Sequence, residues 1–224
     1  MRHEIVACLA HDDDLRTPAA HASLRRVLNR RVDGRVISIG GGPRRVHEAL
    51  TNLNIIVSAG VDIAATAYRL PFRDTSIPAI HCEAVLEHLE FPEDAVREMF
   101  RVLRPGGLVF ASTPFLQPYH GYPDHFQNFT LRGHTRLFER AGFAIVDAGT
   151  CVGPTFAVAD VLANYAREAL PGRIFSRACE RLIRFSGRLF RLADLAVRDR
   201  TSSSNVCSSS FLLAEKPPAS PSVE

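Results

Sequence analysis

Tryptophan is absent from the sequence, and lysine is nearly so, because Lys216 is the one lysine among 27 basic residues. Cysteine is sparse, with five residues in the chain and no Cys-x-x-Cys pair. An odd number of scattered cysteines fits neither a disulfide framework nor a zinc site and is typical of a reducing compartment. No apolar run approaches the roughly 20 residues that span a membrane. These absences predict a cytoplasmic protein.

The composition is that of an ordinary globular protein. The 224 residues are 46% hydrophobic and 23% charged, which suffices for one domain with a full hydrophobic core. The apolar run at residues 5–10 is shorter than the roughly 7–15 residues of a signal peptide, so we expect no export signal. The preference for arginine fits either the codon usage of a GC-rich genome or the recognition of anions by guanidinium groups.

Apolar runs of strand length alternate with stretches of helix length. The predicted strands cover residues 35–39, 53–57, 61–65, 77–82, 108–112, 143–146 and 208–214. The predicted helices cover residues 17–31, 92–103, 130–141 and 155–200, the last interrupted at 171–172. This alternation indicates an α/β fold with a mostly parallel sheet, in which ligands bind at the carboxyl ends of the strands. Candidate functional residues therefore lie just after each strand.

Several segments carry patterns that recur together in one family. They read Val-Ile-Ser-Ile-Gly-Gly-Gly-Pro at 36–43, Ala-Tyr-Arg-Leu-Pro-Phe at 67–72 and His-Cys-Glu-Ala-Val-Leu-Glu-His-Leu at 81–89. Arg-Val-Leu-Arg-Pro-Gly-Gly at 101–107 and Ser-Thr-Pro-Phe at 112–115 come next at matching distances. In this order and spacing, the set resembles a class I S-adenosylmethionine (SAM) dependent methyltransferase, of the type 11-like group, over about residues 33–150.

The resemblance implies a Rossmann-like three-layer sandwich. Its mostly parallel seven-stranded sheet would have an antiparallel last strand, with a helical insertion before it. A single domain, residues 1–216, would comprise an N-terminal helix (17–32), a cofactor-binding core (33–150), the insertion (155–200) and the last strand (208–216), with a flexible tail (217–224). The resemblance also implies SAM as cofactor and a small-molecule or sugar-like acceptor for the methyl group.

The glycines after the first predicted strand suit a cofactor loop. They let the backbone approach a ligand closely, although the same glycines also suit a plain strand–turn–helix. A nicotinamide cofactor is disfavoured because G-x-G-x-x-G would place a glycine where Arg45 stands, and the sequence has no G-K-[ST] phosphate loop.

The resemblance assigns cofactor contacts to residues at the predicted strand ends. They are Gly40, Gly41, Gly42, Asn54, Thr66, Ala67 and Glu83. Thr66 and Ala67 would border the adenine, and Asn54 would stand where the family has an acid for the ribose hydroxyls. Asp62 is the alternative ribose partner, but it lies only eight residues before Leu70 and leaves no room for the usual helix.

Several of these positions lack a charge that the family carries. Ser38, Asn54 and Thr66 stand where the family usually has acids, and Arg44 stands where it has a third glycine. Carboxylates make charge-assisted hydrogen bonds that are roughly twice as strong as neutral ones. These departures support a second hypothesis, a non-catalytic methyltransferase-fold protein with weakened or lost SAM binding that acts as a scaffold or regulator.

The loop after the fifth predicted strand holds the candidate catalytic residues. A hydroxyl acceptor must lose a proton, and histidine has a suitable pKa near neutral pH. We assign His120 or His125 as the base and Asp124 as its orienter, with methylation at a hydroxyl oxygen. The alternative is that these residues only hold the loop in place. Their spacing lacks the fixed helical pattern of a metal site, so we expect no metal.

The predicted helical insertion carries the positive charge of the chain. Residues 171–200 hold eight arginines against three acidic residues, whereas the whole chain has a net charge of +3. Apolar residues recur beside the arginines at helical spacing from 175 to 196. Such a helix either packs on the core with a solvated basic face or lies on an anionic membrane surface, at the inner membrane face, and serves a lipid-linked acceptor. We expect no nucleic-acid partner, because no known nucleic-acid-binding module is recognisable.

Overall fold

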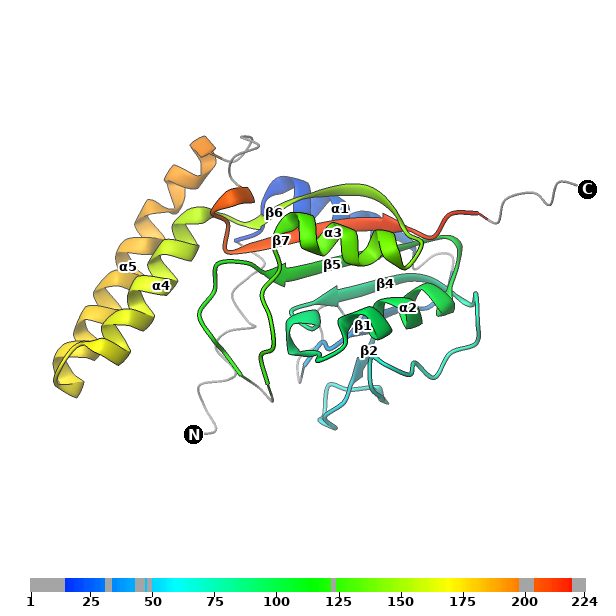
Figure 1. Cartoon of the computed structure of the whole chain (residues 1–224), viewed down its shortest axis with the longest axis horizontal. Helices are drawn as coiled ribbons and strands as arrows, with labels where there is room; N and C mark the ends of the chain where they lie inside the picture. Colours follow the sequence, from blue (N-terminus) through cyan, green and yellow to red (C-terminus); the bar gives the residue numbers. More distant parts are fainter. Residues whose placement is uncertain are drawn as a thin grey trace, which may run out of the picture.

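The computed structural model describes residues 15–30, 34–42, 47, 50–121, 124–197 and 204–218. Its centre is a seven-stranded sheet with the order β3-β2-β1-β4-β5-β7-β6 (Figure 1). The strands are β1 Val36–Ile39, β2 Thr51–Asn54, β3 Ile63–Ala64, β4 Ile77–Glu83, β5 Leu103–Pro114, β6 Ala144–Val152 and β7 Ser209–Glu215. The expectations for the N-terminal apolar run, for Arg44 and Arg45 and for the end of the tail fall outside the described residues.

Parallel pairing runs from β3 through β5, and the last strand reverses. β7 is antiparallel to both β5 and β6, whereas the other neighbouring strands pair in parallel. The carboxyl ends of β1 to β5 therefore lie at one edge of the sheet, which we call the carboxyl edge. The predicted Rossmann-like sheet, mostly parallel with an antiparallel last strand, is confirmed.

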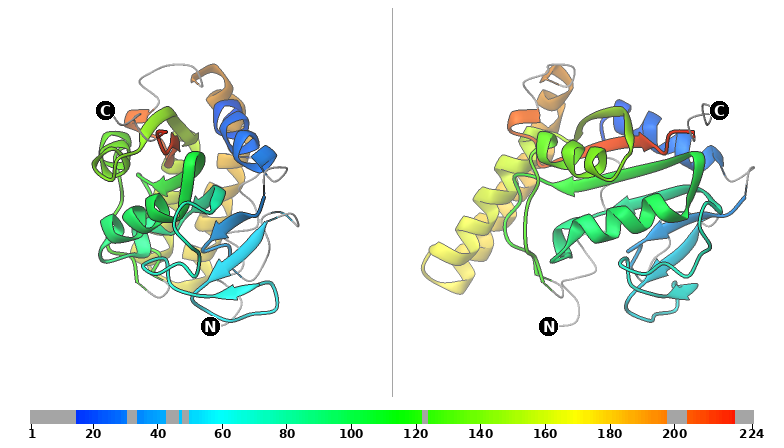
Figure 2. Two further views of the ribbon diagram at one scale, coloured as in Figure 1. Left: turned by 90° about the vertical axis from the view of Figure 1, so that its right-hand side faces the viewer. Right: turned by 45° about the vertical axis from the view of Figure 1, so that its right-hand side comes forward.

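Helices cover both faces of the sheet. α1 Pro18–Asn29 lies on one face, and α2 Pro92–Val102 and α3 Leu131–Arg140 lie on the other (Figure 2). Local signals in the sequence explain where two of them begin. The Thr17 and Thr130 side chains accept hydrogen bonds from main-chain N–H groups in the first turns of α1 and α3, as N-cap residues do.

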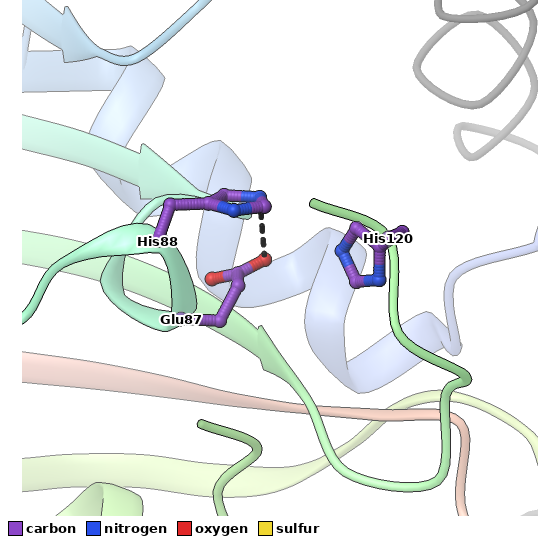
Figure 3. A group of neighbouring side chains, drawn as sticks. All are labelled: Glu87, His88 and His120. Carbon is purple, nitrogen blue, oxygen red and sulfur yellow. Dashed lines mark ion pairs between the residues drawn. The ribbon is translucent and has the colours of Figure 1, made fainter. Parts of the chain in front are cut away.

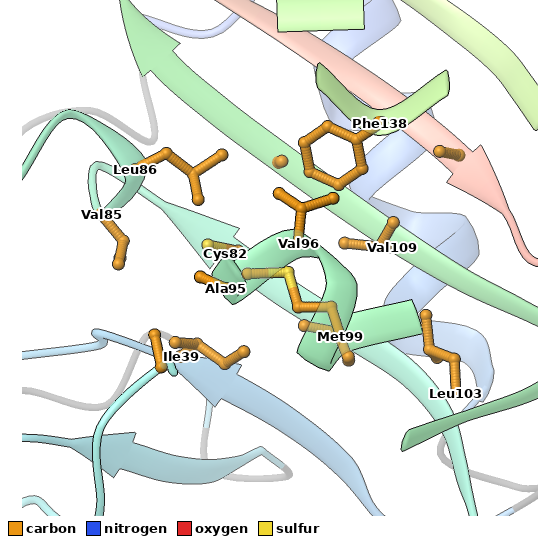
Figure 4. Close-up of a cluster of buried hydrophobic side chains, with 14 of the residues drawn as sticks. Ile39, Cys82, Val85, Leu86, Ala95, Val96, Met99, Leu103, Val109 and Phe138 are labelled. Carbon is orange, nitrogen blue, oxygen red and sulfur yellow. The ribbon is translucent and has the colours of Figure 1, made fainter. Parts of the chain in front are cut away.

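The larger apolar cluster lies between the sheet and the pair α2 and α3. Ala95, Val96 and Met99 lie at helical spacing on the inner face of α2, where all three are buried. They pack in one cluster with Phe138 of α3 and with strand residues such as Ile39 (Figure 4). This cluster fixes α2 against the centre of the sheet, next to the carboxyl ends of β1 and β4.

Three predicted strands have wrong boundaries. β6 continues to Val152 instead of ending at residue 146. β2 ends at Asn54, because its side-chain oxygen accepts a hydrogen bond from the Ile56 N–H and turns the chain, which leaves residues 55–57 exposed. β5 begins at Leu103 rather than at residue 108. Residues 103–108 stay in the strand because the register of pairing with β4 shifts there and Gly106 adopts a positive φ of 74°.

The predicted insertion is a helical hairpin. α4 Pro154–Ala169 and α5 Arg173–Val197 pack against each other and project from the sheet at its carboxyl edge (Figure 1). Small residues form their contact, since Ala163, Ala166 and Ser176 are buried and a Cβ on Gly187 would lie 2.6 Å from the Cβ of Ala159. The two helices therefore meet without using the large apolar side chains of α5.

The apolar stripe of α5 points away from the core over its described part. Ile174, Phe175, Leu182 and Phe185 are 89%, 58%, 67% and 59% exposed. The alternative in which this stripe packs on the core does not hold for these residues. Among the described residues, no helix combines the length and the apolar character that crossing a membrane requires.

A buried ion pair ties the segment before α1 to the end of β4. The Arg16 guanidinium donates to both Glu83 carboxylate oxygens, with distances of 2.6 Å from Nη2 and 3.1 Å from Nε. His81 Nε2 lies 3.1 Å from the same carboxylate, and its Nδ1 lies 3.0 Å from the Ser38 hydroxyl. We call these four residues the Arg16 network. Burial opposes ionisation of Glu83, but the contacts with His81 and Arg16 outweigh it and lower its pKa to about 2.

The loop after β3 is fastened to α2 by Arg101. Its guanidinium donates to Glu98 on the same helix, to Asp74 and to the main-chain oxygens of Leu70 and Phe72. Glu98 also accepts a hydrogen bond from the Leu70 N–H at 2.7 Å. One arginine therefore fixes the path of the Leu-Pro-Phe motif.

We predict that Arg101→Met lowers the free energy of unfolding by about 1–3 kcal/mol, because it removes hydrogen bonds to charged and main-chain partners. Arg97→Met is the matched control, since Arg97 pairs with Asp94 at an exposed i,i+3 position of the same helix. It should change stability by no more than about 0.5 kcal/mol. Urea unfolding followed by circular dichroism measures both, and equal losses would contradict the assignment.

We also predict that Glu83→Gln destabilises the protein in a pH-dependent way. The folded-state pKa of about 2 is below the ordinary value, so ionised Glu83 stabilises the fold above about pH 4.5 and loses this effect as the pH falls toward 2. The pH-dependent part of the stability difference has an upper limit of about 3 kcal/mol. The measured value should be smaller, because the Glu83 side chain is 17% exposed and solvent screens its contacts. Urea unfolding of both proteins between pH 7 and pH 2.5 should show the stability difference shrinking at low pH. A pH-independent difference would contradict the prediction, and Asp94→Asn, at an exposed pair, is the control.

Candidate active site

The glycine loop after β1 is packed too tightly for side chains. Gly40 has a φ of 70°, and a Cβ there would lie 2.2 Å from a methyl group of Val85. A Cβ on Gly41 would lie 2.3 Å from Oδ1 of Asn52, and Gly42 has a φ of 64°. The loop also donates a hydrogen bond from the Gly40 N–H to the main-chain oxygen of Leu53. Only glycine permits this backbone path at the carboxyl edge.

Asn52 supports this loop from the middle of β2. Its side-chain amide donates to the main-chain oxygens of Gly42 and Gly60, at 3.0 Å and 2.8 Å. Its Oδ1 is buried without a hydrogen-bond partner among the described residues. The sequence interpretation did not include Asn52. An asparagine inside a buried strand is unusual, and this position in β2, beside the glycine loop, is the feature that could have indicated the role of Asn52.

The structure separates the two candidates for the ribose position. Asn54 lies at the carboxyl end of β2 and is half-buried. The Asp62 carboxylate instead accepts a hydrogen bond from the Asn52 N–H at 2.8 Å, and its N–H donates to the Asn52 main-chain oxygen. Asp62 therefore caps the main chain of β2, while Asn54 lies at the carboxyl edge.

Thr66 and Ala67 lie after β3 in the loop that Arg101 fastens. The Thr66 hydroxyl accepts a hydrogen bond from the Tyr68 N–H at 3.3 Å, and Ala67 is buried. Glu83, by contrast, is held by Arg16 in the Arg16 network. Its carboxylate is therefore occupied by the protein, a role that the sequence interpretation did not include because Arg16 carried no signal.

The turn after β4 connects the glycine loop with the loop after β5, residues 115–130, which we call the histidine loop. It begins at Ala84, which adopts the left-handed conformation at a φ of 52°, a strained backbone for a residue other than glycine. Val85, the next residue, contacts Gly40 of the glycine loop. Glu87 is fully buried, and neither of its carboxylate oxygens has a hydrogen-bond partner among the described residues. Burial raises the pKa of Glu87 to about 8.

Three histidines meet over this turn. The ring centres of His88 and His120 lie 5.3 Å apart, and those of His120 and His125 lie 4.3 Å apart. His88 comes from the short helix η2 Leu86–His88, and His120 comes from the loop after β5 (Figure 3). His125 belongs to the same loop. The structure thus brings together two segments that are more than 30 residues apart in sequence.

Hydrogen bonds to main-chain groups set the roles of the ring nitrogens. Nδ1 of His88 lies 2.6 Å from the main-chain oxygen of Asp124, and Nδ1 of His120 lies 3.0 Å from that of Pro118. Both Nδ1 atoms therefore carry the proton, and both Nε2 atoms have a free lone pair. Burial lowers the pKa of His88 and of His120, although these two hydrogen bonds oppose the shift. Both rings are neutral near pH 7.

His125 and Asp124, the other two predicted catalytic residues, stabilise the conformation of the loop through hydrogen bonds. His125 Nδ1 accepts a hydrogen bond from the His120 N–H, and its Nε2 lies 2.7 Å from the Asn128 side-chain oxygen. Within the described residues, Asp124 contributes its main-chain oxygen to His88, and no hydrogen bond joins its carboxylate to either loop histidine. Of the three predicted catalytic residues, His120 is thus the one with a free ring nitrogen.

Comparison with known proteins agrees with this architecture. A family model described as a methyltransferase domain matches residues 21–111. An uncharacterized methyltransferase of Mycobacterium leprae is 32% identical over 127 residues, which is 55% of this chain and 46% of the relative. The chain therefore spans about half the length of this curated relative.

Solved structures share the fold at low sequence identity. A putative sarcosine dimethylglycine methyltransferase from Galdieria sulphuraria has a TM-score of 0.54 at 13% identity, over 88% of this chain and 85% of that one. The [4+2]-cyclase SpnF has a TM-score of 0.53 at 20% identity, over 89% of this chain and 81% of that one. With the sheet order, these findings show a methyltransferase-like fold in which residues 21–111 match the family model of a methyltransferase domain.

Proposed function

We propose that the protein binds SAM and transfers its methyl group to a hydroxyl oxygen of a small-molecule or sugar-like acceptor. The observation that supports this most strongly is the arrangement at the carboxyl edge. A glycine loop without room for side chains lies against Val85, and three histidines gather over the same turn. A cofactor at the glycine loop and an acceptor under the histidine loop would then lie on two sides of one turn.

Each part of the edge has a distinct task in this proposal. The backbone of Gly40–Gly42 approaches the cofactor, Asn54 binds the ribose hydroxyls, and Thr66 and Ala67 border the adenine. Glu83 acts through the Arg16 network, which holds β1 and β4 in place behind the cofactor. Bound SAM supplies an electrophilic methyl group.

The histidine loop positions the acceptor and removes its proton. Nε2 of His120 has the free lone pair for this step, while His125 and Asp124 fix the loop through their hydrogen bonds. Since the ring is neutral near pH 7, it accepts a proton without first losing one. Methyl transfer mainly requires that the acceptor oxygen is held in line with the methyl group.

The second candidate is a non-catalytic scaffold or regulator with this fold. Two observations favour it: the Ser38 hydroxyl is committed to His81, and the Glu83 carboxylate is committed to Arg16. Fold alone does not determine the activity, since one of the similar structures is a [4+2]-cyclase. Isothermal titration with SAM and with S-adenosylhomocysteine separates the two candidates. Saturable binding supports the methyltransferase, and no heat at millimolar ligand would contradict it.

For the ribose contact, we predict that Asn54→Asp tightens SAM binding about tenfold. A carboxylate accepts from both ribose hydroxyls with charge assistance, whereas an amide oxygen accepts without it. Asn54→Ala should weaken binding several-fold. The matched control is Asp62→Asn, which keeps an acceptor for the Asn52 N–H and should leave the dissociation constant unchanged. If instead Asp62→Asn weakens binding and the Asn54 variants do not, the ribose partner is Asp62.

For the partner, we propose that the α4–α5 hairpin contacts an anionic membrane surface from the cytoplasmic side, where the protein would meet a lipid-linked acceptor. The exposed apolar stripe of α5 is bordered on the same helix by Arg177 and Arg181, which are also exposed. Apolar side chains that enter the lipid interface beside arginines that bind lipid phosphates are typical of interfacial helices. The hairpin projects from the same edge that carries the histidine loop (Figure 1).

We predict that the protein floats with vesicles that contain phosphatidylserine but not with neutral vesicles. Arg177→Gln combined with Arg181→Gln should weaken binding about 30-fold, at about 1 kcal/mol for each charge. Leu182→Ser combined with Phe185→Ser should abolish flotation. The control is Phe91→Ser, since Phe91 is comparably exposed but lies outside the hairpin. Wild-type protein that stays in the bottom fraction at low salt would overturn the proposal.

A further inference from the structure

We propose that Glu87, His88 and His120 bind one divalent transition-metal ion, with Zn²⁺ as the best match to their donor atoms. Each residue offers one ligand atom, and the three atoms lie within 4.8 Å of one another. Figure 3 shows the three side chains turned toward a common point, from the turn after β4 and from the loop after β5. Two imidazoles and one carboxylate are a donor set found in zinc enzymes that keep a coordination position open for substrate.

The first argument is the orientation of the two imidazoles. Each Nδ1–H is anchored on a main-chain oxygen, that of Asp124 for His88 and that of Pro118 for His120. This leaves the Nε2 lone pair of each ring directed into the cluster. Metal-binding histidines almost always have such a second partner on the opposite nitrogen, because it fixes the tautomer and the ring orientation.

The second argument is the unpartnered carboxylate. Glu87 is 0% exposed, and neither oxygen has a hydrogen-bond partner among the described residues. A buried polar group in that state is costly unless a cation or a hydrogen bond compensates it. Its Oε1 lies 3.8 Å from Nε2 of His88. Ligand atoms around a zinc ion at about 2.0–2.2 Å are separated by roughly 3.4 Å, so small side-chain rotations would close the site.

The third argument is that the hydrogen bonds distinguish the histidines that can bind a metal ion from the one that cannot. His125 lies beside His120 but has both ring nitrogens engaged, by the His120 N–H and by Asn128. The proposed ligands therefore differ from the three loop residues that the sequence analysis considered, which are His120, Asp124 and His125. It includes one loop histidine, and it takes its other two ligands from the Leu-Glu-His segment of η2.

An ion at this position changes the role of His120. The ring has one free lone pair, so it cannot hold the ion and accept a proton in the same state. On the proposed function, the acceptor hydroxyl would bind the open position of the ion, which lowers the pKa of that hydroxyl, and its proton would leave to solvent water. The metal site itself does not depend on SAM binding and is measured separately from it.

The test uses the full chain, stripped with chelator and titrated with Co²⁺ or Zn²⁺. Co²⁺ should give visible absorption bands that saturate at one ion per chain, and Zn²⁺ should displace it. His120→Asn and Glu87→Gln should each weaken binding about 100-fold or more. His125→Asn, at a neighbouring position without a ligand role, should weaken it no more than about tenfold.

A second control addresses the unrelated metal-binding potential of the N-terminus. His11 precedes three aspartates in the sequence, so His11→Asn should leave the affinity unchanged. His120 lies in a half-buried loop, so its variant tests the proposal even if Glu87→Gln fails to fold. Absence of saturable binding, or an affinity that His11→Asn lowers and His120→Asn does not, would overturn the metal site. Titration with S-adenosylhomocysteine in the same samples reports on the proposed function independently.

Discussion

The ion pair between Arg16 and Glu83 is the constraint on which the carboxyl edge depends. It lies at the end of the central strand β4, where a charge without a partner would be costly, and it brings the segment before α1 over the sheet. Through His81 it also reaches Ser38 on β1, so one network joins the neighbouring strands β1 and β4. Because Glu83 is used for this purpose, the proposed function assigns the cofactor contacts to the glycine loop, to Asn54 and to the loop after β3.

Two buried carboxylates four residues apart are treated differently by the fold. Glu83 faces the N-terminal segment and is neutralised by Arg16, which holds it ionised. Glu87 faces the histidine loop and has no side-chain hydrogen-bond partner among the described residues, so burial, together with the charge of Glu83, raises its pKa to about 8. The strained turn at Ala84 separates the two directions. Ionised Glu83 therefore supports the architecture, whereas Glu87 is a buried carboxyl group without a hydrogen-bond partner among the described residues, and the proposed metal site rests on it.

Local signals and family motifs in the sequence predict most of the fold. The mostly parallel sheet with a reversed last strand and the two-helix insertion agree with the structure. Contacts between segments that are distant in the sequence could not be predicted in this way. Arg16 and Glu83 are 67 positions apart, and neither residue by itself indicates the other. The same is true of Asn52, whose role becomes visible only once β2 lies beside β1. The sequence also does not determine whether the apolar stripe of α5 is exposed. Its periodicity defines an apolar face of the helix but does not show which part of the protein packs against that face.

One carboxylate of the hairpin lies close enough to the histidine loop to act on it electrostatically. Asp160 on α4 acts on His120, where its charge opposes the lowering of the pKa by burial. The same carboxylate pairs with Arg184 of α5 at 3.1 Å. The charge felt by His120 therefore depends on how α4 and α5 are placed, although neither helix belongs to the sheet. A hairpin that contacts a membrane through α5 would hold this carboxylate, and with it the histidine loop, in a fixed position relative to the lipid surface.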